Sequence, residues 1–320
     1  MSSIPHHDII GYIHGRHDKL ANLLERLGYQ SEGASFIPPP GHRALFLGDL
    51  IDPKPGHTIP GGVRATLHTV KAMCEAGHAV CLMGNHELNA IYYHTRGRDG
   101  KWLRHHGSRN KAMHSGTLED FPDYRDPGGE WHTVWMPWMR SLPFFFDQGG
   151  LRAVHATWYP ALVERIRGKS LEGEEFMLAG ADETTQEGEA LEVLLRGLTI
   201  RLPDGVKFTD QAQVARNRIR ARWWETAAPG LTYDQLIFPA DPCIPVIPVG
   251  EEWLPLIPGY PHDAPPIFFG HYLKAADALL HPERHNVACL DHRGASDGPL
   301  VAYRWRGEAD IRPEGYVTHG

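Results

Sequence analysis

Short apolar runs alternate with amphipathic stretches along the first third of the chain. Apolar runs of strand length cover residues 8–13, 43–47 and 79–83, and residues 18–27 and 63–76 carry apolar side chains at helical spacing. A glycine follows each of the two helical stretches, where it would end a helix. This order predicts a β-α-β-α-β arrangement at the start of an α/β fold.

Two later stretches interrupt this pattern. Residues 92–138 are rich in His, Arg, Gly and Trp and have little strand character, which predicts a mostly helical or irregular insertion. Residues 159–265 form a second insertion, in which we expect helices at 188–195 and 213–224. The proline-rich residues 239–266 favour an extended surface strap.

Further apolar runs predict strands on both sides of the second insertion. Two of them are joined by Gly149 and Gly150 and would form a hairpin, because paired glycines suit a tight turn. We therefore expect one domain over residues 1–320, with insertions at about 92–138 and 159–265. The predicted strands cover residues 144–147, 151–156, 266–269, 286–290, 300–305 and 309–311.

Each of the three early strands ends in a glycine-containing polar cluster. The clusters read GYIHG after the first strand, GDLID after the second and GNHE after the third. In open α/β sheets, ligands bind beyond the carboxyl ends of the strands, so the three clusters would converge on one crevice. The two insertions would form a cap over it.

The residues at these strand ends are of the types that hold two metal ions side by side. Such a centre needs a bridging carboxylate with imidazole and amide ligands, and it generates a hydroxide nucleophile for phosphoryl transfer. Asp49 stands at a turn and suits the bridge, while Asn85 and His86 follow the third strand. His155 ends a later apolar run, and His271 follows a glycine. Alone, a strand histidine is more often a packing residue and Asp49 a turn residue, but their order along the chain favours a metal centre.

The order of these motifs resembles the calcineurin-like metallophosphoesterases. The chain carries HG, GDxxD, GNHE, a strand-end VH and GH in that order, and its segment NVACLDHRGASDGPLVAYRW resembles the final hairpin of one branch. That branch holds Ser/Thr protein phosphatases and bacterial diadenosine-tetraphosphatase-like enzymes. The resemblance implies an αββα sandwich, in which two mixed β-sheets are flanked by helices. It leaves both insertions unaccounted for.

The resemblance also implies a metal-binding role for each matched residue. Asp49 would bridge two metal ions, and His14 would bind the first of them. The second site would be completed by Asn85, His155 and His271. The ions would be divalent or mixed-valence Mn, Fe or Zn, one or two per chain.

The same resemblance implies a metal-dependent phosphoric ester hydrolase with metal-bound hydroxide as its nucleophile. His86 would be the general acid that protonates the leaving oxygen, and Asp52 would hold the His86 ring in the useful tautomer. The expected substrate is a small phosphorylated molecule of the dinucleoside polyphosphate type or a phosphoprotein.

Two positions depart from the family pattern. The family's first motif reads D-x-H-G, and this chain has Tyr12 in place of the aspartate. A tyrosine is neutral at pH 7 and binds a divalent ion weakly, so Tyr12 suits packing better than metal binding. Where the family has an arginine that grips phosphate, the chain reads DPKP, which leaves Lys54 as a flexible point charge. Lys54, Arg96 or a residue of an insertion would then hold the substrate phosphate.

These departures support a second hypothesis, in which the fold is degenerate and non-catalytic. Such a protein would bind a nucleotide or a protein partner without hydrolysing it. The two hypotheses differ in whether the metal-loaded protein turns over a phosphate ester.

The composition limits the kinds of partner and the cellular compartment that we expect for this chain. The 320 residues include 42% hydrophobic residues, enough for a substantial core, and carry a formal net charge of -7, which favours neither a nucleic acid polymer nor an anionic membrane. The first residues lack the pattern of a signal peptide, and we expect no membrane span. The four cysteines form no CxxC pair, which favours free thiols and a reducing, cytoplasmic setting.

Overall fold

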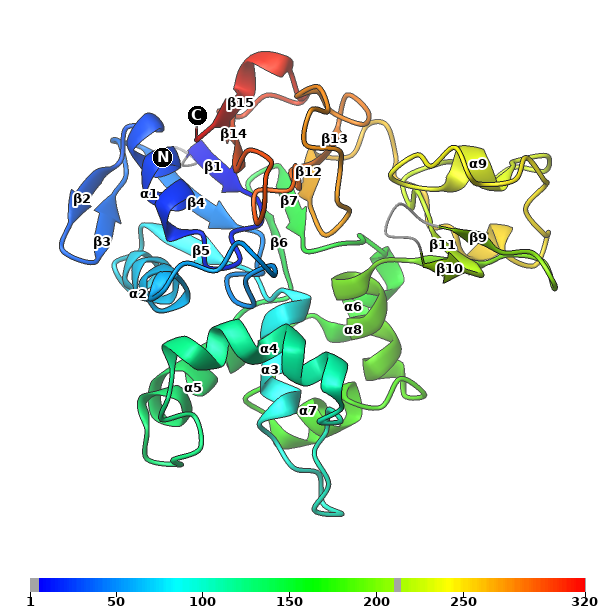
Figure 1. Cartoon of the computed structure of the whole chain (residues 1–320). Coiled ribbons are helices and arrows are strands. Elements are labelled where there is room, and N and C mark those ends of the chain that lie inside the picture. The colour runs from blue at the N-terminus through cyan, green and yellow to red at the C-terminus, as the bar shows by residue number, and fades with distance from the viewer. Residues whose placement is uncertain (1–5, 210–213, 320) are drawn as a thin grey trace.

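Two β-sheets stacked face to face form the centre of the computed structural model, which describes residues 6–209 and 214–319 (Figure 1). The first sheet has the strand order β15-β14-β1-β4-β5. Strands β1, β4 and β5 run parallel, whereas β14 lies antiparallel to β1 and β15 antiparallel to β14. The strands are β1 His6–Ile10, β4 His42–Phe46, β5 Ala79–Cys81, β14 Val301–Trp305 and β15 Tyr316–Thr318.

The second sheet is also mixed, with the strand order β13-β12-β7-β6. Strand β12 runs parallel to both of its neighbours, and β6 and β7 form the antiparallel hairpin expected around the two glycines. The strands are β6 Phe145–Gln148, β7 Leu151–Val154, β12 Ile267–Phe269 and β13 Val287–Cys289.

The two sheets bury a shared apolar layer. Ile9 and Leu45 of the first sheet pack in one cluster with Phe268 and Ala288 of the second, and all four are fully buried. Burial of apolar surface contributes about 25 cal/mol per Å², so this layer holds the sheets firmly together. The strand ends of both sheets are thereby fixed relative to one another.

Helices cover the outer face of the first sheet. Helix α1 (His17–Arg26) buries Leu20, Leu23 and Leu24, which are three and four residues apart and share one face. Helix α2 (Gly62–Glu75) packs beside α1 and against β5. A short hairpin follows α1, with β2 at Gln30–Glu32 and β3 at Ser35–Ile37.

The second insertion covers the outer face of the second sheet. Trp223 and Trp224 pack against Phe269 of β12, with ring centroids 5.2 and 5.3 Å from its ring. Both sheets are thus covered outside, which confirms the expected sandwich class. The insertion contains α6 Pro160–Ile166, α7 Glu174–Gly180, α8 Gln186–Arg196, β8 Thr199–Arg201, β9 Phe208–Thr209, β10 Ala215–Arg216, β11 Arg218–Arg220, α9 Tyr233–Leu236 and the 3-10 turn η2 Leu254–Leu256.

The first insertion is helical and irregular, as its composition predicts. Helix α3 leads into it from β5, and α3, α4 and α5 lie together below the sheets in Figure 1. Helix α3 covers Asn85–Tyr93, and the insertion after it contains α4 Ser108–Asp120, the π-helix η1 Trp131–Trp135 and α5 Met136–Arg140. No helix in residues 6–209 and 214–319 combines the length and the apolar character that a membrane crossing requires.

The helix expected at 213–224 is wrong. Residue 213 lies outside the described residues, and Arg218–Arg220 forms β11, which pairs antiparallel with β8. Ile219 is buried between two exposed arginines, which is the alternation of a strand. Pairing with a neighbouring segment therefore outweighs the helical appearance of this arginine-rich stretch.

The strand expected at 309–311 is also wrong. These residues form a loop, in which the Ile311 amide donates to the His285 carbonyl at 2.6 Å. The last strand of the first sheet comes later, as β15, after the 3-10 turn η3 at Pro313–Gly315. A three-residue strand gives too short a pattern to locate this edge strand from the sequence.

Candidate metal centre

The predicted site residues stand on strained turns at the ends of strands. Positive φ angles of 46°, 55°, 60° and 66° occur at His14, Asp49, Asp52 and His271. Among the other non-glycine residues that the structure describes, Arg293 alone has a positive φ. This conformation costs about 1 kcal/mol or more for a residue with a side chain, and such strain clusters at functional sites.

Glycines bring the turns after β4 and β5 into direct backbone contact. A Cβ atom on Gly48 would lie 2.5 Å from the amide nitrogen of Gly84, and a Cβ on Gly84 would lie 2.3 Å from the amide nitrogen of Asp49. Both positions therefore require glycine. The contact allows the His86 amide to donate to Asp49 Oδ1 at 3.0 Å, which joins the two motifs.

Glu87 fastens these two turns, although sequence reasoning gave it no role. Its buried carboxylate accepts hydrogen bonds from the amides of Asp49 and Leu50 at 2.8 Å each and from the amide of Gly84 at 3.1 Å. Burial, and after it the Asp49 carboxylate, raise the pKa of Glu87 to about 7. The GNHE motif already contains this residue, so its place at the end of that motif was the available signal.

Three side chains gather with Asp49 on one side of its carboxylate. Ligand atoms of Asp49, His155 and His271 lie within 4.8 Å of one another. The Asn85 amide oxygen lies 3.0 Å from His155 Nε2 and 2.9 Å from His271 Nδ1. His155 Nδ1 donates to the Leu47 carbonyl at 2.6 Å, so its Nε2 keeps a lone pair that faces the centre. We call Asp49, Asn85, His155 and His271 the complete half of the centre.

The two histidines of the complete half are neutral. Burial lowers the pKa of His155, and burial followed by the charge of Arg220 lowers the pKa of His271 well below its usual value. Neutral imidazole is the form that binds metal. His271 Nε2 is buried and has no hydrogen-bond partner among the described residues, which is costly unless a ligand satisfies it.

Tyr12 lies in the centre but turns its hydroxyl toward a histidine. The hydroxyl oxygen lies 2.7 Å from His155 Nε2 and 3.2 Å from the His155 carbonyl. Burial, and after it the Asp49 carboxylate, raise the pKa of Tyr12 well above 10, so it remains a neutral phenol. Its ring also fills the space beside Gly270, where a Cβ would lie 2.1 Å from Tyr12 Cε2. These contacts agree with a packing role.

The other side of Asp49 has fewer ligands. His14 Nε2 lies 3.5 Å from Asp49 Oδ2, and His14 Nδ1 donates to the Ile51 carbonyl at 2.8 Å. His86 completes a group with these two residues, with ligand atoms within 4.8 Å of one another. We call His14, Asp49 and His86 the reduced half, because Tyr12 stands where the family has a second carboxylate.

His86 and Asp52 form a buried pair beside the reduced half. His86 Nδ1 donates to Asp52 Oδ2 at 2.8 Å. The other carboxylate oxygen, Oδ1, accepts from His114 Nδ1 at 2.7 Å and from Thr117 Oγ1 at 2.8 Å. Burial alone would lower the pKa of His86, but the Asp49 carboxylate and the bond to Asp52 raise it above its usual value. The structure thus joins the predicted acid to its orienting carboxylate and adds two residues of α4.

Two cations lie near the centre. After burial, the charge of Lys54 is the largest cause that lowers the pKa of His14. Arg220 of β11 is exposed and acts on His271 in the same way. Arg96 lies elsewhere, since its guanidinium stacks 3.8 Å from the centroid of a tryptophan ring and lines a groove of about 950 Å³ that contains none of the metal-centre residues. An arginine inside an insertion carries no local sequence signal, so Arg220 was missed.

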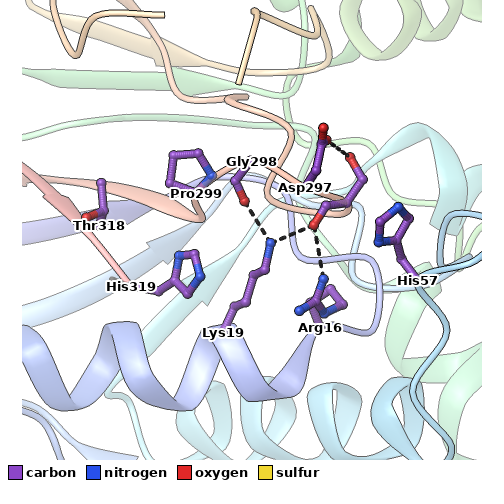
Figure 2. A pocket seen from close by; sticks show the side chains of 9 residues that line it. Arg16, Lys19, His57, Asp297, Gly298, Pro299, Thr318 and His319 are labelled. Carbon is purple, nitrogen blue, oxygen red and sulfur yellow. Dashed lines mark hydrogen bonds between the residues drawn. The ribbon is translucent and has the colours of Figure 1, made fainter. Parts of the chain in front are cut away.

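A separate hollow of about 680 Å³ lies between α1 and the loop at residues 294–299 (Figure 2). Lys19 donates to three carbonyl groups of that loop at 2.7 to 3.0 Å. Arg16 forms an ion pair with Asp18 at 2.7 Å. Both cations therefore have partners within the fold, and their contacts tie the loop to α1.

The donor atoms of the complete half fit a divalent metal ion. A carboxylate, an amide oxygen and two neutral imidazoles form the mixed oxygen and nitrogen set that Mn, Fe and Zn accept. They converge on Asp49 from separate strand ends, and one nitrogen of His271 lacks a partner in the described chain. The reduced half has one fewer donor of this kind, so an ion there would be held less tightly.

A family model and two curated proteins match part of the chain. A family model described as calcineurin-like phosphoesterase matches residues 8–177. A stretch of 91 residues is 37% identical to the asymmetrical bis(5'-nucleosyl)-tetraphosphatase PrpE of Halalkalibacterium halodurans and covers 28% of this chain and 34% of that protein. The PrpE protein of a Geobacillus species is 33% identical over 92 residues, which is 29% of this chain and 35% of that protein. The alignments span about a third of the length of these curated relatives.

Similarity to solved structures is more distant. The cold-active protein-tyrosine phosphatase of a Shewanella species aligns over 99% of this chain and 81% of its own, at 14% sequence identity and a TM-score of 0.48. A likeness at this level does not bear on activity.

Proposed function

The chain belongs to the calcineurin-like phosphoesterase family, and on this premise we propose that it is a metal-dependent hydrolase of phosphoric esters or phosphoanhydrides. The observation that carries the proposal is the convergence of Asp49, His155 and His271, whose ligand atoms come from three separate strand ends and lie within 4.8 Å of one another. His271 Nε2 is buried without a hydrogen-bond partner among the described residues, which is costly unless a ligand satisfies it.

A bound metal ion would neutralise charge on the phosphoryl oxygens and lower the pKa of a water molecule, so that hydroxide is available to attack phosphorus. Asp49 would be the ligand that both halves share, and His14 would be a ligand on the reduced side. Asn85, His155 and His271 would complete the set that holds one ion of Mn, Fe or Zn.

His86 would protonate the leaving oxygen. Its Nδ1 hydrogen is bound to Asp52, so Nε2 is the nitrogen that is free to face a substrate. The raised pKa of His86 keeps more of the ring protonated near neutral pH than an ordinary histidine would be. Asp52 fixes the tautomer and the direction of the ring.

Lys54 and Arg220 are the groups that we propose for holding the substrate phosphate. Both act electrostatically on histidines of the centre, and Arg220 supplies the planar donor that the DPKP segment lacks. Arg220 belongs to the second insertion, so this assignment includes that insertion in a cap over the site. Arg96 keeps only a more distant role in substrate binding.

A dinucleoside polyphosphate is the substrate that we favour over a phosphoprotein. The support is the similarity to two proteins named as bis(5'-nucleosyl)-tetraphosphatases. All four cysteines are free thiols, so we also propose the reducing cytoplasm as the working compartment.

Assays with purified protein loaded with Mn, Fe or Zn test this function. We expect turnover of diadenosine tetraphosphate and of an aryl phosphate, and a loss of about 10³-fold or more in Asp49→Asn, because the bridging carboxylate is removed without a change of shape. The matched control is Asp204→Asn, whose carboxylate is 93% exposed and remote from the centre.

The competing assignment is a non-catalytic fold that binds a nucleotide or a protein partner. The observation in its favour is the hydroxyl of Tyr12, which lies 2.7 Å from the metal-facing nitrogen of His155. No turnover with any of the three metals, together with activity that appears only in Tyr12→Asp, would establish this alternative and refute the hydrolase.

A further inference from the structure

Helix α4 of the first insertion contributes two side chains to the Asp52 carboxylate. His114 and Thr117 are three residues apart, so they share one face of the helix. These residues are 4% and 0% exposed, and both donate to Asp52 Oδ1, at 2.7 and 2.8 Å. Thr117 Oγ1 also accepts from the Asp52 amide at 2.8 Å. The turn that holds Asp52 is therefore bound to an element outside the sandwich.

His94 continues this series of hydrogen bonds from the end of α3. Its Nε2 lies 3.1 Å from His114 Nε2. A carboxylate only accepts, so His114 Nδ1 carries its hydrogen toward Asp52 whichever of the two rings donates in the second bond. Trp131 packs against both rings, with centroid distances of 5.4 and 5.7 Å. The His114 ring is thus held at both nitrogens and on its face.

This arrangement leaves a single oxygen of Asp52 for His86. Two donors occupy Oδ1, while Oδ2 faces His86 Nδ1 at 2.8 Å. Asp52 has a φ of 60°, and such a conformation persists only where surrounding contacts hold it. A shift of about 1 Å in a catalytic group costs about 10²-fold in rate, so the α4 contacts bear directly on catalysis.

We propose that His114 is a positioning residue, which fixes the Asp52 carboxylate and thereby the His86 ring that protonates the leaving group. This role rests on the proposed function, because it requires His86 to act as the general acid. It gives the first insertion a part in the chemistry in addition to covering the crevice. Its contribution is largest for a leaving group that needs a proton.

The variants His114→Asn and His114→Leu form a matched pair. Asparagine and leucine have nearly the same shape, but only asparagine donates a hydrogen bond from the position of Nδ1. Phenyl phosphate has a leaving group that needs protonation, whereas the leaving group of 4-nitrophenyl phosphate needs it far less. In His114→Leu we expect kcat on phenyl phosphate to fall about 10²-fold and kcat on 4-nitrophenyl phosphate to fall much less, with KM unchanged for both. In His114→Asn most of the kcat returns.

Equal losses on the two substrates, or equal losses in the Asn and Leu variants, would overturn this role and leave His114 as a structural residue. Circular dichroism establishes whether each variant is folded. If His114→Leu does not fold, Thr117→Val removes the other donor to the same oxygen, and the same dependence on the leaving group is expected. A wild-type protein that hydrolyses neither substrate refutes the proposed function itself, whereas an active wild type with variants insensitive to the leaving group refutes only the role of His114.

Discussion

The two halves of the metal centre share Asp49 but differ in the number of ligands around it. The complete half adds an amide oxygen and two neutral imidazoles to the carboxylate, whereas the reduced half has two histidines, one of which is the proposed acid. The cause is one residue, because Tyr12 packs beside Gly270 and bonds to His155 instead of presenting a carboxylate. A single strand-end residue thus removes one candidate ligand while the sandwich stays intact.

The halves also differ in what holds them in place. His155 is fixed by the Leu47 carbonyl at the end of a sandwich strand. His14 Nδ1 instead donates to the carbonyls of Ile51 and Asp52, at 2.8 and 3.1 Å, in the turn that α4 supports. The complete half therefore depends on the sandwich, and the reduced half depends also on the first insertion.

Loss of a ligand should be far more damaging in the complete half. We expect His271→Ala to weaken metal binding by more than about 100-fold and His14→Ala by about tenfold or less, because even an outer residue of a metal site is worth 10- to 100-fold. Competition with a chelator of known affinity measures both values. His105→Ala, at an exposed position, is the control. A larger effect for His14→Ala would reverse the comparison.

Restoring the carboxylate should remove the difference between the halves. Tyr12→Asp gives the reduced half the ligand that the family pattern has, and we expect the metal content to rise from one ion per chain to two. Tyr12→Asn provides a matched control, because it has the same size but no charge to hold the second ion. An unchanged content in Tyr12→Asp would show that something other than Tyr12 limits the reduced half.

A fall in pH should destabilise the contacts that hold the reduced half in place, because His94 becomes protonated. Burial, and after it the charges of His114 and His132, lower the pKa of His94 from 6.5 to about 3. The folded state therefore favours neutral His94. The stabilisation of the folded state by neutral His94 is fully present above pH 6.5 and is lost as the pH falls from 6.5 toward 3. Between pH 7 and pH 5 the loss is about 2 kcal/mol, since one pKa unit corresponds to about 1.4 kcal/mol.

Urea unfolding of the metal-free protein at pH 7 and pH 5 measures this loss. The free energy of unfolding should drop by about 2 kcal/mol more in the wild type than in His94→Gln, which keeps a donor but does not titrate. The exposed variant His105→Gln should behave as the wild type. An equal drop in His94→Gln would show that protonation of His94 is not the cause of the lost stability.

The smallest effect is expected for Tyr12→Phe. This change removes the hydroxyl that bonds to His155 Nε2 and keeps the ring that packs beside Gly270. A buried hydrogen bond contributes about 1 kcal/mol, so the metal-free protein should lose about that much stability. Metal affinity should change less than about threefold, because neutral Tyr12 is not a ligand. A loss of 100-fold in affinity would show that Tyr12 does bind metal.

The strand ends of the site were predictable because their signal is local. Asp49, Asn85, His155 and His271 each follow an apolar run, and three of these positions come directly after a glycine that close packing requires. Strand ends of parallel neighbours meet at one edge of a sheet, so local order along the chain was enough to infer that they converge. The apolar runs also predicted most of the strands, whereas their arrangement in two mixed sheets was implied by the resemblance to the family.

The support of the site was not predictable, because it depends on how separate elements pack. His114 and Thr117 lie in a polar helix of an insertion, and only the docking of α4 brings them to Asp52. Arg220 sits on a strand that sequence reasoning took for a helix. Such residues can be identified only once the long-range contacts that place their elements against the strand ends are known.

Elemental analysis of the protein as purified is the sharpest test of the difference between the two halves. We expect one tightly bound transition-metal ion per chain, held by the complete half, and no ion after Asn85 and His271 are both replaced by alanine. Two ions per chain in the wild type would contradict the distinction between the halves. An ion content of zero, or one that survives the double replacement, would contradict the metal centre itself.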